Sequence, residues 1–226
     1  MSETAHYIGH RKRLRERFAK AGAEGLADYE LVELLLFSAL PRSDAKPLAK
    51  RLCDRFGSVG AILAVEPSAL AEVKGAGKAK IHALKLAEAI SLRILRDQIV
   101  ERPVIASWKS LLDYCKAKLA HQMNEQFNVL FLDNSNSLIA DETQQKGTVN
   151  HVPLYPREVI KRALELSASA VILVHNHPSG DPTPSPTDIE MTEEVCEAGK
   201  KLGIAVHDHL IFSRTGHSSF KSMGLL

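Results

Sequence analysis

The stretch that decides the fold is residues 170–188, AVILVHNHPSGDPTPSPTD. It begins with five consecutive apolar residues, most of them branched, which is typical of a buried β-strand. His175 and His177 follow, and a loop rich in glycine and proline then leads to Ser185-Pro186, a typical helix start. We therefore expect a strand, a turn and a helix, with polar side chains gathered where the strand ends.

The rest of the second half of the chain has the same texture. Short apolar runs at residues 127–132, 170–174 and 204–212 predict strands. Helical patterns occupy residues 107–120, 156–167 and 188–202, with Pro156 suited to a first helical position and Gly203 following the last helix. We predict a mixed α/β domain, an α+β arrangement around a mixed sheet, over residues 103–226.

The first half of the chain is helical instead. Between His10 and Arg96, apolar residues recur three and four positions apart, and Pro41, Gly57 and Pro67 interrupt the pattern. Several short packed helices fit these breaks. We therefore predict that a small all-α domain over residues 1–102 precedes the α/β domain.

Two glycines, Gly75 and Gly77, separate helical patterns within residues 70–90, which is the layout of a helix-hairpin-helix. Such a turn exposes backbone N–H groups that bind phosphate, and Lys74, Lys78 and Lys80 would add positive charge. Ala76 departs from the DNA-binding version, which has a larger apolar residue between the glycines. A plain tight turn between helices explains the pattern equally well.

Charge is distributed unevenly along the chain. The net formal charge is only +2, but residues 1–102 hold 18 Lys and Arg against 13 Asp and Glu. Residues 10–20, HRKRLRERFAK, hold six Lys and Arg and one acid, Glu16, so they could form a cationic helix face. Nucleic acid is therefore an expected partner of residues 1–102, although a solvated surface helix fits as well.

Cysteine content and hydropathy restrict the class of protein. Cys53, Cys115 and Cys196 are widely separated and odd in number, which predicts free thiols rather than a disulfide framework. No apolar run approaches the roughly 18 residues that a membrane span needs, and the N-terminal stretch lacks a signal-peptide core. We expect a cytoplasmic protein with no membrane partner.

The spacing of His175 and His177 points to a metal site. Residues two apart in an extended chain project to the same side, so both imidazoles could bind one ion, with Asp188 as a third ligand. Two imidazoles and one carboxylate suit Zn²⁺ and leave a fourth position open, as a catalytic zinc requires. The alternative is that Ser185 and Asp188 only cap a helix while the histidines make ordinary hydrogen bonds.

The pattern His175-x-His177, seven residues, Ser185-x-x-Asp188 resembles the motif of JAMM-type metalloproteases, which have MPN+ or Mov34/JAB domains. Further stretches resemble the RadC (UPF0758) family of bacteria along nearly the whole chain. They are HRKRLRERF, LLLFSALPRSDAKPLAKRL, GTVNHVPLYPREVIKRAL and LGIAVHDHLIF. The resemblance implies a JAB/MPN-like fold with cytidine-deaminase-like layering, and zinc held by His175, His177 and Asp188. It also implies Glu125 as general base and Ser185 as a stabiliser of the oxyanion.

The resemblance alone selects Glu125, which stands just before the run FNVLFL. Spacing leaves Glu142, Glu158 and Glu165 as rivals. The pair Asp208-His209 is a candidate for orienting the site by hydrogen bonds, and a plain buried polar pair is an equal alternative. His207 and His217 receive no role.

Together these features predict a zinc-dependent metallopeptidase or isopeptidase. Glu125 would act as the base, and Ser185 would donate to the oxyanion that forms on an attacked peptide or isopeptide carbonyl. The second hypothesis is a DNA-binding protein, with a link to DNA repair that the resemblance to the RadC family implies, whose zinc domain is structural or acts on DNA or on partner proteins. A third, a metal domain that has lost catalysis and only binds partners, is disfavoured because the motif is intact.

Overall fold

The computed structural model describes residues 9–39, 44–100, 103–146 and 154–226. The chain divides into two compact units, Met1–Ile90 and Ser91–Leu226. Each unit has its own apolar core, and each is described by itself. The dividing point lies within one long helix, whereas the domain boundary that we place at residue 102 from the sequence stays a prediction.

Helices build all the regular structure described in the first unit, in agreement with its sequence pattern. They are α1 (His10–Ala21), η2 (Ala23–Gly25), α2 (Asp28–Ala39), α3 (Lys46–Phe56), α4 (Val59–Ala64), α5 (Pro67–Ala71) and the part of α6 (Lys78–Val100) that precedes Ser91. Leu36, Leu52 and Ile62 are fully buried in the centre of this unit. Burial of these apolar faces, rather than helix propensity alone, stabilises such short helices.

The turn between α5 and α6 contains the glycine pair singled out in the sequence. Gly75 adopts a positive φ of 95°, a conformation that side chains other than glycine rarely adopt. Ala76 is almost completely buried against the core of the unit, and its amide donates to Val73 O at 2.9 Å. The small residue between the glycines therefore anchors the turn.

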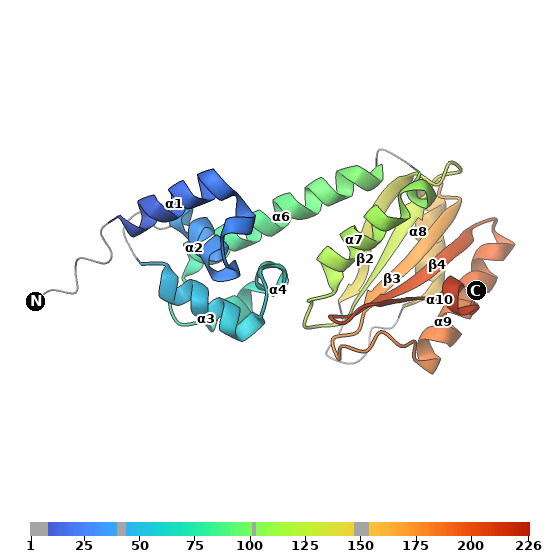
Figure 1. Ribbon diagram of the computed structural model, residues 1–226. Helices are drawn as coiled ribbons and strands as arrows, with labels where there is room; N and C mark the ends of the chain where they lie inside the picture. Colours follow the sequence, from blue (N-terminus) through green and yellow to red (C-terminus); the bar gives the residue numbers. More distant parts are fainter. Residues whose placement is uncertain (1–8, 40–43, 101–102, 147–153) are drawn as a thin grey trace, which may run out of the picture. The chain divides into compact units, whose positions relative to one another are not determined.

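A five-stranded mixed sheet forms the centre of the second unit (Figure 1). Its strands are β1 (Gln126–Leu132), β2 (Leu138–Lys146), β3 (Ala170–Asn176), β4 (Ala205–Phe212) and β5 (His217–Ser219), in the order β2-β1-β3-β4-β5. Only β3 and β4 pair in parallel; the other neighbours are antiparallel. The parallel pair needs a crossover, and helix α9 (Pro186–Lys201) provides it.

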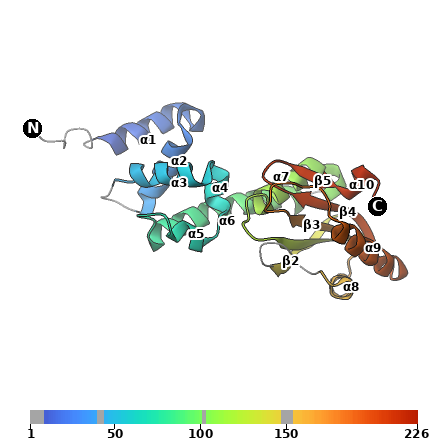
Figure 2. The same ribbon diagram turned by 90° about the horizontal axis from the view of Figure 1, so that it is seen from below.

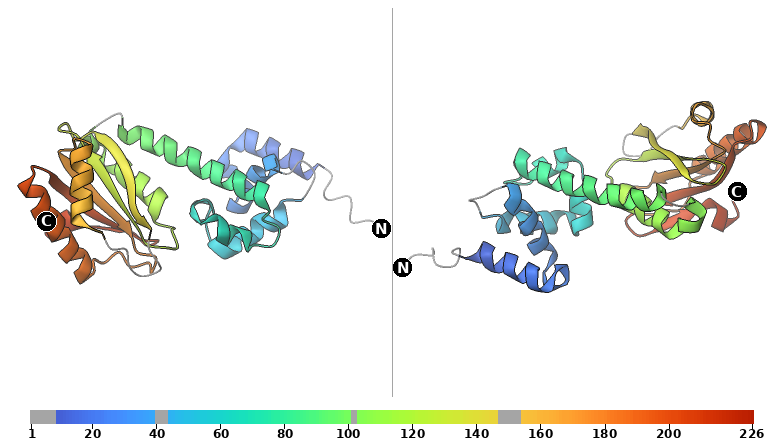
Figure 3. Two further views of the ribbon diagram at one scale, coloured as in Figure 1. Left: turned by 180° about the vertical axis from the view of Figure 1, so that it is seen from behind. Right: turned by 90° about the horizontal axis from the view of Figure 1, so that it is seen from above.

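Helices cover both faces of this sheet. Helix α7 (Trp108–Leu119) packs on one face through Leu111 and Leu119, which share a core with Leu130 and Ile172 of the strands. Helices α8 (Pro156–Glu165) and α9 lie on the opposite face, as Figures 2 and 3 show from other directions. The short elements η3 (Val104–Ser107) and α10 (Phe220–Met223) complete the unit. The α/β fold expected from the sequence is confirmed as a three-layer arrangement.

Strands β2 and β5 were not predicted. The sequence of β2, LIADETQQK, is mostly polar, which an edge strand that pairs on one side only can tolerate. Strand β5 has three residues, too few for a recognisable pattern. The three cysteines are free thiols, as expected. No described helix is long and apolar enough to cross a membrane.

Candidate metal centre

His175 and His177 lie where β3 ends and its loop begins. His175 is the last but one residue of the strand and is fully buried, whereas the side chain of His177 is 16% exposed. The two Nε2 atoms approach each other to 2.9 Å. The two histidines thus converge, as their spacing in the sequence predicts.

Asp188 reaches the same point from the first turn of α9. A capping box begins this helix: Ser185 Oγ accepts from the Asp188 amide, while Asp188 Oδ2 accepts from the Ser185 amide at 2.7 Å. The other carboxylate oxygen, Oδ1, lies 3.3 Å from His175 Nε2. Helix capping and metal binding are therefore compatible, because the carboxylate faces the cap with one oxygen and His175 with the other.

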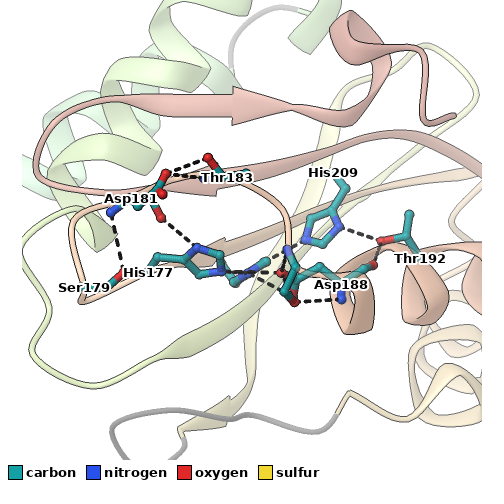
Figure 4. A network of polar contacts seen from close by, with 9 residues as sticks. His177, Ser179, Asp181, Thr183, Asp188, Thr192 and His209 are labelled. Carbon is teal, nitrogen blue, oxygen red and sulfur yellow. Dashed lines mark hydrogen bonds and ion pairs between the residues drawn. The ribbon is translucent and has the colours of Figure 1, made fainter.

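Three potential ligands meet at this point: His175, His177 and Asp188, whose ligand atoms all lie within 4.8 Å of one another. His177 Nδ1 lies 2.9 Å from Asp181 O, a carbonyl that can only accept, so Nδ1 carries a proton. In the neutral ring, Nε2 then presents its lone pair to the other two ligands. Figure 4 shows His177 between Asp181 and Asp188. Electron-pair donors as close as these ligand atoms repel one another unless a proton or a metal ion lies among them.

Burial and the neighbouring charges set the protonation of the group. Burial lowers the pKa of His175 to about 4, which keeps the ring neutral near pH 7. For Asp188, burial by itself raises the carboxyl pKa, but the neighbouring His177, His175 and Ser185 outweigh burial and hold that pKa well below its usual range. For His177, burial is outweighed by Asp188, the Asp181 carbonyl and the charge of Glu125, so its pKa is raised.

Aromatic rings and hydrogen bonds restrain His175. Phe127 of β1 stacks on its ring with a centroid separation of 5.2 Å and an interplanar angle of 13°. On the other side, His175 Nδ1 lies 2.8 Å from His209 Nε2 of β4, and His209 in turn stacks on Phe220 at 4.4 Å. Both imidazoles are therefore fixed in orientation by packing, which is a requirement for a preorganised metal site.

Glu125 immediately precedes β1. Antiparallel pairing places Phe127 opposite His175, so continuing the same register places Glu125 opposite His177. Side chains two residues apart share a face of a strand, so Glu125 follows Phe127 toward the histidines. Its charge contributes to the raised pKa of His177, which is consistent with this position beside the candidate centre.

The segment that holds Glu125 is tied to β3 by Asn176, the residue between the two histidines. Asn176 is 1% exposed. Its Oδ1 accepts from the Gln126 amide at 2.9 Å, and its Nδ2 donates to Asn124 O at 3.1 Å and to Gln122 O at 3.4 Å. The residues on both sides of Glu125 are therefore hydrogen-bonded to one buried amide.

The three rival glutamates are engaged elsewhere. Glu142 of β2 accepts from the Arg162 guanidinium, with a shortest distance of 2.6 Å. Glu165 also pairs with Arg162, and Glu158 pairs with Arg157, all on the surface of α8. Of the four candidates, Glu125 is the one whose charge acts on a residue of the histidine and aspartate group.

The hydroxyl of Ser185 is used within the cap. It donates to Asp188 Oδ2 at 2.6 Å and accepts from the Asp188 amide at 3.2 Å. The structure thus brings Ser185 next to the candidate ligands. To donate to a substrate oxygen, its hydroxyl would have to exchange the bond to Asp188 for a new one.

Asp208 and His209 point to opposite sides of the sheet, so they do not act as a pair. His209 contacts His175, as described above. Asp208 accepts instead from Ser219 Oγ at 2.6 Å and from the Lys221 amide at 3.0 Å, and so fixes the start of α10. His217 stacks on Phe212 and His207 contacts Asn136, which leaves both outside the centre.

Sequence reasoning did not single out Asn176 or Thr192, although both are buried polar residues next to the candidate ligands. Asn176 interrupts the histidine pair in an otherwise apolar strand, which is a usable signal. Thr192 stands four residues after Asp188, and residues at that spacing lie on one helix face. Neither signal is specific without the structure.

Comparison with known sequences covers both units. Residues 105–225 match the family profile described as RadC-like JAB domain, and residues 6–82 match the one described as UPF0758 N-terminal. A UPF0758 protein of Rhodobacter capsulatus is 58% identical over 213 residues, which cover 94% of this chain and 100% of that relative.

Proposed function

The chain belongs to the RadC family, and from that premise we propose that it is a zinc-dependent hydrolase of the JAMM type that cleaves a peptide or isopeptide bond. JAB domains are often hydrolytic, so the family supports the reaction class without naming a substrate. The observation that carries the proposal is the convergence of His175, His177 and Asp188 beside Glu125.

The donor set fits zinc. Two imidazole nitrogens and one carboxylate oxygen are ordinary zinc ligands, and the 2.9 Å contact between the Nε2 atoms needs a cation or a proton among the three. His177 Nε2, His175 Nε2 and Asp188 Oδ1 would hold the ion. A zinc ion held there would polarise a substrate carbonyl and make water a stronger acid near neutral pH.

A catalytic ion is favoured over a structural one by the number of ligands. Within the described parts of the chain, the candidate group has three members, whereas structural zinc sites almost always have four protein ligands. His209 is the nearest further histidine, but its two nitrogens face His175 and Thr192. The fourth coordination position is thus left for water or substrate.

Glu125 would carry a proton from the attacking water to the leaving amine. Its carboxylate would accept a proton from the attacking water as the new C–O bond forms, and would then deliver that proton to the leaving amine as the C–N bond breaks. The proton count balances over one hydrolysis, since one water is consumed and the amine gains one of its hydrogens. Glu125 lies outside the ligand group, which suits a proton carrier rather than a ligand.

Ser185 would stabilise the negative charge that develops on the carbonyl oxygen. Its hydroxyl stands 2.6 Å from Asp188 Oδ2 and would turn from that oxygen to the substrate oxygen. Removal of one oxyanion donor typically costs about 10² to 10³ in kcat. The helix would keep its other cap bond, because Asp188 Oδ2 also accepts from the Ser185 amide.

The proposal is tested by screening peptide and isopeptide substrates for cleavage that a chelator abolishes and zinc restores. We expect the wild-type protein to cleave at least one class of substrate. The Glu125→Gln variant should still hold zinc but should cleave the same substrate about 10² to 10⁴ times more slowly. Glu142→Gln is a matched control, because it neutralises a glutamate that pairs with Arg162 instead. Cleavage that persists without metal, or that proceeds at the wild-type rate in Glu125→Gln, would contradict the proposed function.

A second function, nucleic-acid binding by residues 1–102, is favoured by one further observation. A hollow of about 600 Å³ is lined by residues 71 and 73–80, which include Lys74, Lys78 and Lys80 and the first turn of α6. Backbone amides at a helix start together with lysines are suited to phosphate. Of these three lysines, Lys80 already donates to Gly75 O at 2.6 Å, which leaves Lys74 and Lys78 as the better candidates for a ligand.

Fluorescence anisotropy with short DNA over a salt series tests this second function. The wild-type chain should bind with an affinity that falls as salt rises, and Lys74→Glu with Lys78→Glu should weaken binding. The control, Lys109→Glu with Lys116→Glu, places the same charge change on α7. Equal loss in both double variants, or affinity that ignores salt, would remove the case for a phosphate site at this turn.

A further inference from the structure

Thr192 is a buried residue of α9, one helical turn after Asp188, and its described hydrogen bonds go to Asp188 O and to His209 rather than to a candidate ligand atom. It is 1% exposed. Its Oγ1 lies 2.5 Å from Asp188 O and 2.7 Å from His209 Nδ1 (Figure 4). The hydroxyl therefore connects the helix that begins with Asp188 to the imidazole that contacts His175.

The direction of these hydrogen bonds follows from the chemistry of the groups. A threonine hydroxyl has one proton, and a carbonyl oxygen can only accept, so the proton of Thr192 is directed to Asp188 O. Threonine commonly bonds in this way to the carbonyl four residues earlier in a helix. Thr192 Oγ1 must then accept from His209, which places a proton on His209 Nδ1.

This assignment fixes the next hydrogen bond. A neutral His209 with its proton on Nδ1 has a lone pair on Nε2, and that atom lies 2.8 Å from His175 Nδ1. His175 must therefore donate from Nδ1, which leaves its own Nε2 unprotonated. That nitrogen is the one that lies 2.9 Å from His177 Nε2 and 3.3 Å from Asp188 Oδ1.

Without the Thr192 hydroxyl, the proton of neutral His209 would no longer be held on Nδ1. A neutral imidazole can offer either a proton or a lone pair from Nε2, and the first option would place the proton of His175 on Nε2, the nitrogen that faces the other ligands. Metal-bound histidines usually rely on a carboxylate or a backbone carbonyl, which can only accept. Here the carbonyl of Asp188 acts through two intermediate residues.

We propose that Thr192 is a positioning residue of the candidate metal centre, which acts through His209 to keep the Nε2 lone pair of His175 directed at the ion. The proposal rests on the metal site of the proposed function but not on hydrolysis. The chain of hydrogen bonds begins at the backbone carbonyl of Asp188 and ends at the centre where the Asp188 carboxylate lies. Asp188 thus contributes twice. Its carboxylate is a candidate ligand, and its backbone carbonyl determines, through Thr192 and His209, which nitrogen of His175 carries the proton.

The first experiment measures zinc affinity of the full chain by competition with a chromophoric chelator. Thr192→Val keeps the branched shape but removes the hydroxyl, and we expect its affinity to fall about 10-fold to 100-fold, the range for partners that orient metal ligands. Thr192→Ser retains the hydroxyl and should stay close to wild type. Thr143→Val is the matched control. It removes a hydrogen bond between Thr143 of β2 and Asn128 of β1, and β2 lies on the opposite side of β1 from β3.

The second measurement begins with metal-free wild-type protein, for which the result does not depend on how any variant folds. ¹⁵N NMR of the imidazole nitrogens at about pH 8, well above the usual histidine pKa, reports which nitrogen carries the proton. We expect His175 and His209 both to carry it on Nδ1. In Thr192→Val, the His175 signal should become a mixture of the two tautomers, and Thr192→Ser should restore it.

The results separate the two proposals. If wild-type protein binds no zinc, the proposed function fails, while the NMR measurement still decides the role of Thr192. If zinc binds but Thr192→Val matches wild type, or the serine variant is as weak as the valine variant, the role of Thr192 is overturned. A proton on Nε2 of His175 or His209 in wild-type protein would overturn it directly.

Discussion

Each unit of the protein contains a histidine paired with a carboxylate, and the two cases differ in how many electron-pair donors meet. In the first unit, His10 Nε2 lies 2.9 Å from Glu33 Oε1, and the Glu33 side chain is fully buried. In the second unit, two imidazoles and Asp188 converge. One proton shared in a hydrogen bond is enough to join His10 and Glu33. The second group has three electron-pair donors, and one proton cannot form a hydrogen bond of equal strength to all three.

The surroundings differ in the same way. Glu33 Oε2 has no hydrogen-bond partner among the described residues, so nothing described prepares the first pair for a ligand. Around the second group, Phe127, Asn176 and His209 fix the rings and the adjacent backbone. The comparison indicates that a metal centre is distinguished by several converging donors in fixed orientations, and not by a paired histidine and carboxylate alone.

The largest expected effect comes from removing a ligand. His175→Ala or His177→Ala should reduce bound zinc from about one per chain to near zero, because two remaining ligands hold the ion poorly. His10→Ala should leave zinc content unchanged, although it strands the buried Glu33 carboxylate and should lower the thermal stability of the first unit. Elemental analysis of purified protein decides the matter; full zinc content in the double variant His175→Ala, His177→Ala would place the metal elsewhere.

Replacement of the candidate base should come next in size. Glu125→Gln keeps the shape of the side chain but cannot accept a proton, so turnover should fall by about 10² to 10⁴ while zinc content is retained. Steady-state kinetics on the substrate found by the screen, together with elemental analysis, measure the two quantities. Wild-type turnover in this variant would show that Glu125 is not the base.

A smaller effect is expected at Asn176. Asn176→Ala removes the three hydrogen bonds that hold residues 122–126. Misplacement of Glu125 by about 1 Å should lower kcat by up to about 100-fold with zinc content unchanged. Hydrogen exchange of the Gln126 amide gives an independent measure, since that amide loses its acceptor; a protected amide with normal kcat would show that Asn176 does not position the base.

The smallest effect concerns stability against pH in metal-free protein. The pKa of His175 is about 4 in the folded chain because of burial, against about 6.5 when unfolded. The unfolded state therefore binds more protons between these values, and the free energy of unfolding should fall by up to about 1.4 kcal/mol for each pH unit as pH decreases. The raised pKa of His177 has the opposite sign, but its contribution is fully present below the unfolded value and is lost only as pH rises.

Urea unfolding of chelator-treated protein over this pH range measures that slope. His175→Gln cannot take up the proton and should show a flatter dependence. Equal slopes in the two proteins would mean that another buried group controls the acid sensitivity.

Much of the second unit could be predicted because its buried strands are continuous apolar runs. The helix start at Ser185-Pro186 was also correct, since a capping box depends on neighbouring residues only. The edge strand β2 could not be predicted from the sequence, because a strand that pairs with a neighbour on one side only does not need an apolar sequence. His175, His177 and Asp188 could be grouped from spacing, because strand and helix geometry bring such positions together.

The surround of the site could not be predicted in the same way. His209 comes from a strand that lies next to β3 only after the crossover through α9. The direction of Asp208 away from the centre follows from alternation along β4, which the sequence shows only when the buried face is known. Thr192 acquires its importance from a hydrogen bond to a residue 17 positions away. Such long-range contacts carry no local sequence signal.

The central claim is that His175, His177 and Asp188 hold one zinc ion and leave a position open. X-ray absorption at the zinc edge of the purified protein, with anomalous scattering from crystals, tests it most directly. We predict one zinc per chain with two imidazole nitrogens and one carboxylate oxygen as its protein ligands. A fourth protein ligand, or zinc bound at a site away from β3 and α9, would contradict the account.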